Sequence, residues 1–164
     1  MTGEELRALQ APLKAQYRAE PEAARITLRA EASLDAGVSC SVETGRALVQ
    51  AGLHPATGGS GELACSGDML LQALAACAGV TLRAVATALD LPVRGGRVTA
   101  EGDLDFRGTL GVDREATVGF SRIRLHFHLE GETTPEQEQK LLSLTERYCV
   151  VLQTLRRGTE VVLT

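Results

Sequence analysis

Residues 66–80 read SGDMLLQALAACAGV, and this stretch does most to define the fold. Between 69 and 80 every residue except Gln72 is apolar or small, and the run contains no proline. An α-helix that is apolar on all sides is normally buried on most of them. The sequence therefore predicts a buried central helix over roughly 67–89, with Cys77 in its middle.

Alternating apolar and polar residues predict strands on both sides of this helix. Three short runs joined by turns precede it, at 26–33, 38–43 and 46–51, and a glycine-rich loop follows them at 54–67. Two longer runs come after the helix, at 98–106 and 122–129. Each run has one apolar face and one polar face, as expected for a strand in an antiparallel sheet.

A second helix is predicted from its start signal. Thr134 and Gln137 have the spacing of a capping box, and a proline stands between them. We expect the helix to reach Cys149 and to continue as far as Gly158, a residue that ends helices. Residues 161–163 are expected to form a closing strand. Strands in groups, rather than in strict alternation with helices, indicate the α+β class.

The 164 residues suit one main domain with a short extension. Thr2 and Glu5 have capping-box spacing at the start of an amphipathic helix, which predicts a helical extension over 1–22. The remaining residues, 23–164, form the predicted domain. A helix as apolar as 67–89 is hard to cover within one small domain, so we expect a tight dimer that buries it.

Composition restricts the function classes. Aromatic residues make up only 3% of the chain, there is no Trp, and the formal net charge is -4, which argues against a nucleic-acid partner. No signal peptide and no run of ~20 apolar residues is evident, so we expect a cytoplasmic protein without a membrane span. Four cysteines in such a reducing compartment are expected to be core thiols, metal ligands or redox groups.

Cys77 and Cys149 both lie on or beside predicted helices and are the candidate redox pair. A thiol peroxidase needs one thiolate to attack the peroxide and a second thiol to condense with the resulting sulfenic acid. The alternative is an inert core residue, since free cysteine is often buried as a small hydrophobe. That alternative fits Cys40 on the apolar face of its strand, whereas Cys65 stands in a loop.

Two segments resemble the cysteine motifs of the OsmC/Ohr family. Residues 66–77, SGDMLLQALAAC, resemble the first motif, and residues 146–155, ERYCVVLQTL, resemble the second. The resemblance implies an OsmC-like fold, with antiparallel sheets around two buried helices in an intertwined homodimer. It also implies a peroxidase for organic hydroperoxides, in which Cys77 attacks, Cys149 resolves and an external dithiol restores both thiols.

The sequence departs from that family at three positions. Gly67 stands where the peroxidases place a glutamate, and Thr57 stands where OsmC-type members have the arginine that pairs with it. Val150 stands where a proline usually follows the second cysteine. Since such an ion pair stabilises a thiolate, its loss predicts a Cys77 that is weakly activated or activated by other groups.

Three other residues are candidates for activating Cys77 or lining its pocket: Arg46, His54 and Asp68. A non-enzymatic member of the same fold that binds a small apolar ligand is the alternative function. His126 and His128 share one face of a strand and offer a third hypothesis, a metal site, although neighbouring arginines would repel a cation. The resemblance itself implies neither a metal nor an organic cofactor.

Overall fold

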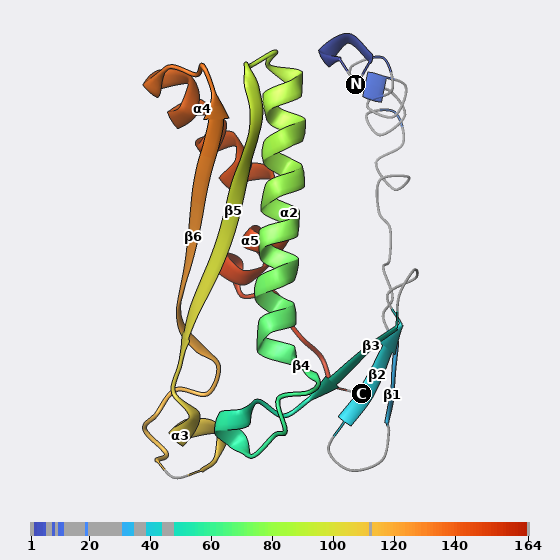
Figure 1. The fold of residues 1–164 in the computed structure, drawn as a ribbon, viewed down its shortest axis with the longest axis vertical. Helices are drawn as coiled ribbons and strands as arrows, with labels where there is room; N and C mark the ends of the chain where they lie inside the picture. The colour runs from blue at the N-terminus through green and yellow to red at the C-terminus, as the bar shows by residue number, and fades with distance from the viewer. Residues whose placement is uncertain are drawn as a thin grey trace. The chain divides into compact units, whose positions relative to one another are not determined.

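The structure, a computed structural model, describes residues 2–5, 8, 10–11, 19, 31–34, 39–43, 48–111 and 113–163. Its elements in chain order are β1 (Glu31–Leu34), β2 (Ser39–Glu43), β3 (Leu48–Gly52), the short 3-10 helix η2 (Pro55–Thr57), β4 (Ala64–Cys65), α2 (Ser66–Ala88), β5 (Val93–Leu104), α3 (Phe106–Thr109), β6 (Phe120–Gly131), α4 (Pro135–Tyr148) and α5 (Val150–Arg157). Figure 1 shows these elements along the ribbon. Their grouping is that of the predicted α+β class.

Contacts inside the chain divide it into two compact units. The first unit holds Met1–Thr27, Leu74–Thr99 and His126–Thr164. The second unit holds Leu28–Ala73 and Ala100–Leu125. The long elements α2, β5 and β6 therefore contribute residues to both units.

The N-terminal segment begins with the predicted helix start. Glu5 N donates to Thr2 Oγ1 at 3.1 Å and Thr2 N donates to Glu5 Oε2 at 2.8 Å, the reciprocal pattern of a capping box. Residues 3–5, 8 and 10–11 are helical. The boundary predicted after residue 22 lies outside the described residues, so the division into 1–22 and 23–164 stays a prediction.

Strands β1 to β4 form one sheet in that order. β1, β2 and β3 pair antiparallel, with Val42 opposite Val49, which confirms the predicted meander where it is described. β4 pairs parallel to β3, with Gly52 opposite Cys65, inside the segment predicted to be a loop. Two residues are too few to show the alternation by which a strand is recognised in a sequence.

Helix α2 buries one stripe along the hairpin of β5 and β6 (Figure 1). The stripe consists of Leu74, Ala78, Leu82 and Ala86. Leu82 and Ala86 pack with Val93 and Leu141 to form the core of the first unit. In the single chain Val80 on the opposite face is 72% exposed, so burial of the helix on most sides stays a prediction that depends on the expected dimer. The described part of the chain leaves that apolar face of α2 uncovered.

Helix α2 is also long and apolar enough to cross a membrane by length and composition alone. It has 23 residues, and the mean hydropathy of its most apolar window is 1.6. A single helix of this kind is weak support for a membrane location, because the core helix of a soluble protein passes the same criterion. In the single chain Leu82 and Ala86 pack against Val93 and Leu141, and 22% of the apolar window of α2 is buried.

The hairpin of β5 and β6 is longer than the predicted strands of 98–106 and 122–129. Gly95 and Gly96, expected to lie between the helix and the first strand, lie inside β5. Gly96 has a φ of 150°, and a Cβ there would meet the carbonyl oxygen of His128 at 2.3 Å. Glycine therefore permits a close approach of the two strands at a position where the sequence pattern indicates a turn.

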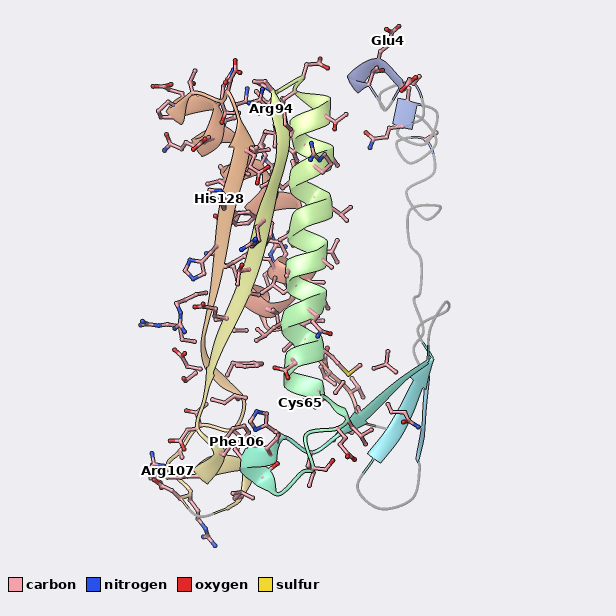
Figure 2. The ribbon with its side chains drawn as sticks, in the orientation of Figure 1. Glu4, Cys65, Arg94, Phe106, Arg107 and His128 are labelled. Atoms are coloured by element: carbon pink, nitrogen blue, oxygen red, sulfur yellow. The ribbon has the colours of Figure 1, made fainter. Side chains whose placement is uncertain are left out.

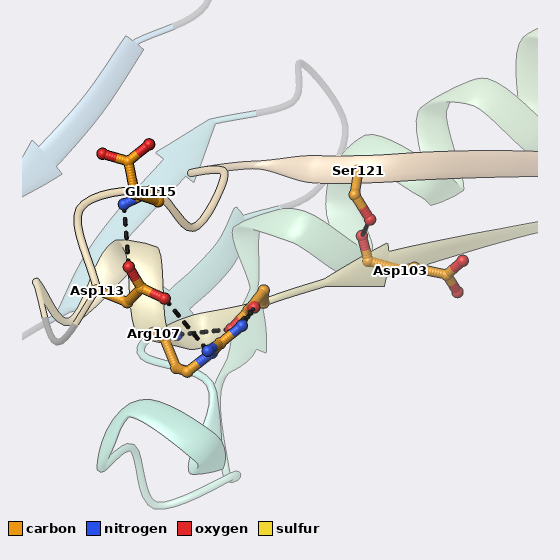
Figure 3. A network of polar contacts seen from close by, with 6 residues as sticks. Asp103, Arg107, Asp113, Glu115 and Ser121 are labelled. Carbon is orange, nitrogen blue, oxygen red and sulfur yellow. Dashed lines mark hydrogen bonds and ion pairs between the residues drawn. The ribbon is translucent and has the colours of Figure 1, made fainter.

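Helix α3 begins where the alternating pattern predicts that Phe106 continues the strand. The side chain of Asp105 caps α3 by accepting from Arg107 N at 3.0 Å. The Arg107 guanidinium binds the Asp105 carboxylate at 2.6 Å and Asp113 at 3.2 Å (Figure 3). These hydrogen bonds from Arg107 lower the pKa of Asp105, and they organise the loop between the two long strands.

The second helical segment begins as predicted but breaks once. Thr134 Oγ1 accepts from Gln137 N at 3.3 Å and Gln137 Oε1 accepts from Thr134 N at 2.9 Å, which completes the capping box. The predicted continuous helix is divided into α4 and α5, because Cys149 between them has extended backbone with φ −71° and ψ 107°. Gly158, with a φ of 62°, ends α5 as predicted.

The predicted closing strand is not formed by residues 159–163. Val161, Val162 and Leu163 are 81%, 69% and 94% exposed. A strand needs partners for its backbone N–H and C=O groups, and the described part of this single chain offers none to the segment. The sequence pattern indicates the preference for an extended conformation, but it does not indicate the partner.

Candidate functional site

Cys77 and Cys149 lie in the same unit and come from different helical segments. Cys77 stands in the middle of α2 and is partly buried, whereas Cys149 occupies the break between α4 and α5 and is fully buried. Both are free thiols, and each affects the pKa of the other. The structure thus brings together the two cysteines that the sequence pairs, while their roles stay a prediction.

The backbone around Cys149 closes one helix and opens the next. Cys149 N donates to Thr145 O at 2.9 Å, and Gln153 N donates to Cys149 O at 2.9 Å. The Gln153 side chain donates from Nε2 to Glu146 O at 2.8 Å. In a continuous helix this carbonyl would accept from the N–H of Val150 instead. The break therefore releases the Val150 N–H from helical bonding.

The sulfur of Cys77 is surrounded by polar groups from both helical segments. Burial opposes its ionisation, but the Val151 N–H, the Cys149 thiol, the Val150 N–H and the Thr81 hydroxyl outweigh burial and lower the pKa of Cys77. The two N–H groups belong to the first turn of α5, where such groups lack helical partners and the helix dipole is positive. Cys77 is therefore ionised at a lower pH than an ordinary cysteine.

The pKa of Cys149 is shifted in the opposite direction. Burial raises its pKa, the Leu152 N–H partly offsets this, and the hydrogen bond and negative charge of Cys77 raise it further. Two thiols this close titrate as a pair. The opposite directions of the two shifts mean that Cys77 loses its proton more readily than Cys149.

The groups around Cys77 differ from those that the sequence patterns indicated. Asp68 is exposed in the first turn of α2, where its charge suits the positive helix end, and it belongs to the second unit. Arg46 lies outside the described residues, so the roles suggested for both residues stay predictions. Thr81 was missed, although its spacing of four from Cys77 on a helix is the signal that indicates contact.

His54 has a local structural role in the second unit. Its Nδ1 accepts from Ala56 N at 3.0 Å and caps η2, and its carbonyl accepts from Thr57 Oγ1 at 2.9 Å. Its ring stacks on Phe106, labelled in Figure 2, with 4.9 Å between centroids and 20° between planes. The described contacts of His54 are those of a cap, and its part as a base for Cys77 stays a prediction.

The remaining cysteines and histidines lie on other elements than the thiol pair. Cys65 is partly buried in β4, next to the start of α2 (Figure 2), and Cys40 lies in β2, for which only the backbone is described. His126 and His128 alternate along β6 and share a face with Arg124. Within the described ranges no three His, Cys, Asp or Glu side chains gather as metal ligands would. The metal hypothesis therefore gains no third ligand.

A small cavity of about 90 Å³ lies between α2 and the start of the hairpin. Its apolar wall includes Leu82, Val98 and Leu129, and its polar wall includes Arg83, Arg97 and His128. Arg83 is engaged there, since its Nη1 donates to Val93 O at 2.7 Å. Neither Cys77 nor Cys149 lines this cavity, so it is separate from the thiol pair.

Comparison with known proteins finds a family and a fold. A model of the OsmC family, described as OsmC-like protein, matches residues 59–164. The chain is similar in structure to an OsmC-like protein from Mycoplasma pneumoniae, with 16% identity, a TM-score of 0.68, and coverage of 80% of this chain and 88% of that one. A comparison with curated proteins finds no match.

Two further solved structures share this fold. One is an organic hydroperoxide resistance protein OsmC from Legionella pneumophila, with 20% identity, a TM-score of 0.64, and coverage of 81% of this chain and 91% of that one. The other is an organic hydroperoxide resistance protein from Elizabethkingia anophelis with crystallant-derived thiocyanate bound. It has 20% identity, a TM-score of 0.64, and coverage of 80% of this chain and 89% of that one. At such identities the likeness establishes the fold.

Proposed function

Because the chain belongs to the OsmC-like protein family, we propose that it is a thiol-dependent peroxidase that reduces organic hydroperoxides through Cys77 and Cys149. The observation that carries this proposal is the opposite shift of two contacting thiols, with the pKa of Cys77 lowered and that of Cys149 raised. A thiolate is the form that attacks a peroxide, whereas the resolving thiol reacts afterwards. The organic hydroperoxide resistance proteins among its structural relatives support the substrate class.

The proposed reaction uses only the two thiols and a hydroperoxide. The Cys77 thiolate attacks the terminal oxygen of the substrate, the O–O bond breaks, and the alkoxide takes up a proton and leaves as an alcohol. Cys77 is then a sulfenic acid. The Cys149 thiol attacks its sulfur, which forms the disulfide and releases water. An external dithiol then reduces the Cys77–Cys149 disulfide by thiol–disulfide exchange, which returns both cysteines to free thiols.

We infer that the working form is a homodimer. Support comes from the uncovered face of α2, where Ala73, Ala76 and Val80 are exposed at spacings of three and four. Monomeric soluble proteins rarely expose large contiguous apolar surfaces. The exposed residues 161–163 are a second apolar segment that lacks a partner within the described part of the chain. Resemblance to the family implies that such a dimer is intertwined.

The proposal is tested by the product that forms with cumene hydroperoxide. Reduced protein is treated with one equivalent of the peroxide, and its free thiols and intact mass are measured beside Cys77→Ser and Cys149→Ser. We expect one Cys77–Cys149 disulfide in the wild type, a sulfenic or over-oxidised Cys77 in Cys149→Ser, and no rapid reaction in Cys77→Ser. Free thiols that persist in excess peroxide would remove the peroxidase and favour the ligand-binding alternative.

A further inference from the structure

The break between α4 and α5 exists here without the residue that would most simply enforce it. A proline after Cys149 would end the helix, because it has no N–H and its ring clashes with the carbonyl four residues earlier. Val150 occupies that position and imposes no such constraint. Other contacts must therefore prevent α4 from continuing into α5.

Glu146, in the last turn of α4, receives two contacts from α5. Its backbone carbonyl accepts from Gln153 Nε2 at 2.8 Å, and its carboxylate binds the Arg156 guanidinium. Gln153 and Arg156 lie three residues apart, so they share one face of α5. Both contacts cross the break, and together they connect the middle and the last turn of α5 to the end of α4.

The contact of Gln153 with the carbonyl has a direct consequence for Cys77. A continuous helix would use the Glu146 carbonyl to bind the Val150 N–H. In this structure the Glu146 carbonyl accepts from Gln153 Nε2 across the break, and the Val150 N–H is among the groups that lower the pKa of Cys77. The side chain of Cys149, the N-cap residue of α5, makes no capping hydrogen bond. The first N–H groups of α5, those of Val150 and Val151, both act to lower the pKa of Cys77.

We propose that Gln153 and Arg156 are positioning residues that clamp the helix break through Glu146 and hold the first N–H groups of α5 against the sulfur of Cys77. This inference rests on the proposed role of Cys77 as the nucleophile. Val150 has an N–H that a proline at this position would lack. This difference from the family pattern therefore adds a donor to the groups that lower the pKa of Cys77. The chain has this clamp but lacks the glutamate and the arginine that the family resemblance leads one to expect at positions 67 and 57.

The test is the pH profile of Cys77 alkylation by iodoacetamide, measured in the full-length protein with no peroxide present. Gln153→Met keeps the length of the side chain but removes its donor. We expect its profile to move to higher pH and the rate at pH 7 to fall roughly two- to fivefold, the effect of losing one helix-terminus interaction with an anion. Arg156→Met is expected to shift the profile in the same direction.

Matched controls separate the clamp from general effects on α5. Thr154→Val removes a hydrogen bond from Thr154 Oγ1 to Val150 O inside α5, at 2.9 Å, without touching Glu146. Arg157→Met removes the same charge as Arg156→Met from the same turn. Both control profiles are expected to match the wild type, and circular dichroism checks that each variant is folded.

The outcomes distinguish the clamp from the peroxidase. Profiles of Gln153→Met and Arg156→Met that coincide with the wild type would overturn the clamp, whatever the peroxidase activity. Shifted profiles in a protein that forms no disulfide with hydroperoxide would support the clamp and reject the peroxidase. If Gln153→Met does not fold, Arg156→Met compared with Arg157→Met decides the question by the same readout.

Discussion

Cys77 is stabilised as a thiolate by neutral donors, among them backbone N–H groups of a neighbouring helix and a hydroxyl on its own helix. Each such donor is weaker than an arginine, but several converge on one sulfur. Cys149 adds its thiol and stays protonated. Among the described residues, the groups that lower the pKa of Cys77 are neutral, and their effect depends on the geometry of Val150 and Val151.

At the residue scale, Thr81→Val tests the side-chain donor. Valine keeps the shape of threonine and removes the hydroxyl that lowers the pKa of Cys77. A neutral hydrogen bond contributes roughly 0.5–1.5 kcal/mol, so the thiolate fraction at neutral pH should fall about two- to tenfold. The alkylation rate of Cys77 against pH measures this, and its midpoint should rise.

Thr81→Ser is the control for this prediction, because serine keeps the hydroxyl and should keep the wild-type profile. Below the pKa of Cys77 the rate should fall tenfold for each unit of pH in every variant. A profile for Thr81→Val that overlays the wild type would show that the hydroxyl does not act on the sulfur.

At the scale of elements, the sequence predicted the helix ends that depend on nearby residues and missed the features that depend on distant ones. The capping box at Thr134 and the glycine at 158 were confirmed, because each depends on residues within one turn. The break at Cys149 was missed, since it involves a side chain seven residues beyond Glu146. The extension of β5 through Gly96 was missed because it depends on His128 in the opposite strand.

In the candidate site, too, the sequence predicted some features and missed others. The motifs around Cys77 and Cys149 predicted the two thiols that the structure brings into contact. The spacing of four between Cys77 and Thr81 on α2 is visible in the sequence, but a hydroxyl carries no charge pattern that marks it as a group acting on the thiol. The N–H groups at the start of α5 could not be predicted, because backbone donors carry no signature and become available only through the break.

At the scale of the whole molecule, the apolar composition of α2 exceeds what the single chain buries. Val80→Glu places a charge on the uncovered face and tests the proposed dimer. Since burial of an unpaired carboxylate costs several kcal/mol, the dissociation constant of the dimer should rise by at least about a hundredfold. Analytical ultracentrifugation across a dilution series measures it.

Val118→Glu is the matched control, because Val118 is 70% exposed but lies in the loop before β6. This variant should assemble as the wild type does. Dimers of unchanged affinity in Val80→Glu would exclude this face of α2 as the interface.

The central claim is that Cys77 is an activated thiolate that reacts with organic hydroperoxides. The measurement that tests it most directly is the second-order rate constant for loss of the Cys77 thiol with cumene hydroperoxide at pH 7, compared with free cysteine. A lowered pKa and an oriented partner predict a rate at least about tenfold above that of free cysteine, lost in Cys77→Ser. A rate no faster than that of free cysteine would contradict the claim and make ligand binding the better function for this chain.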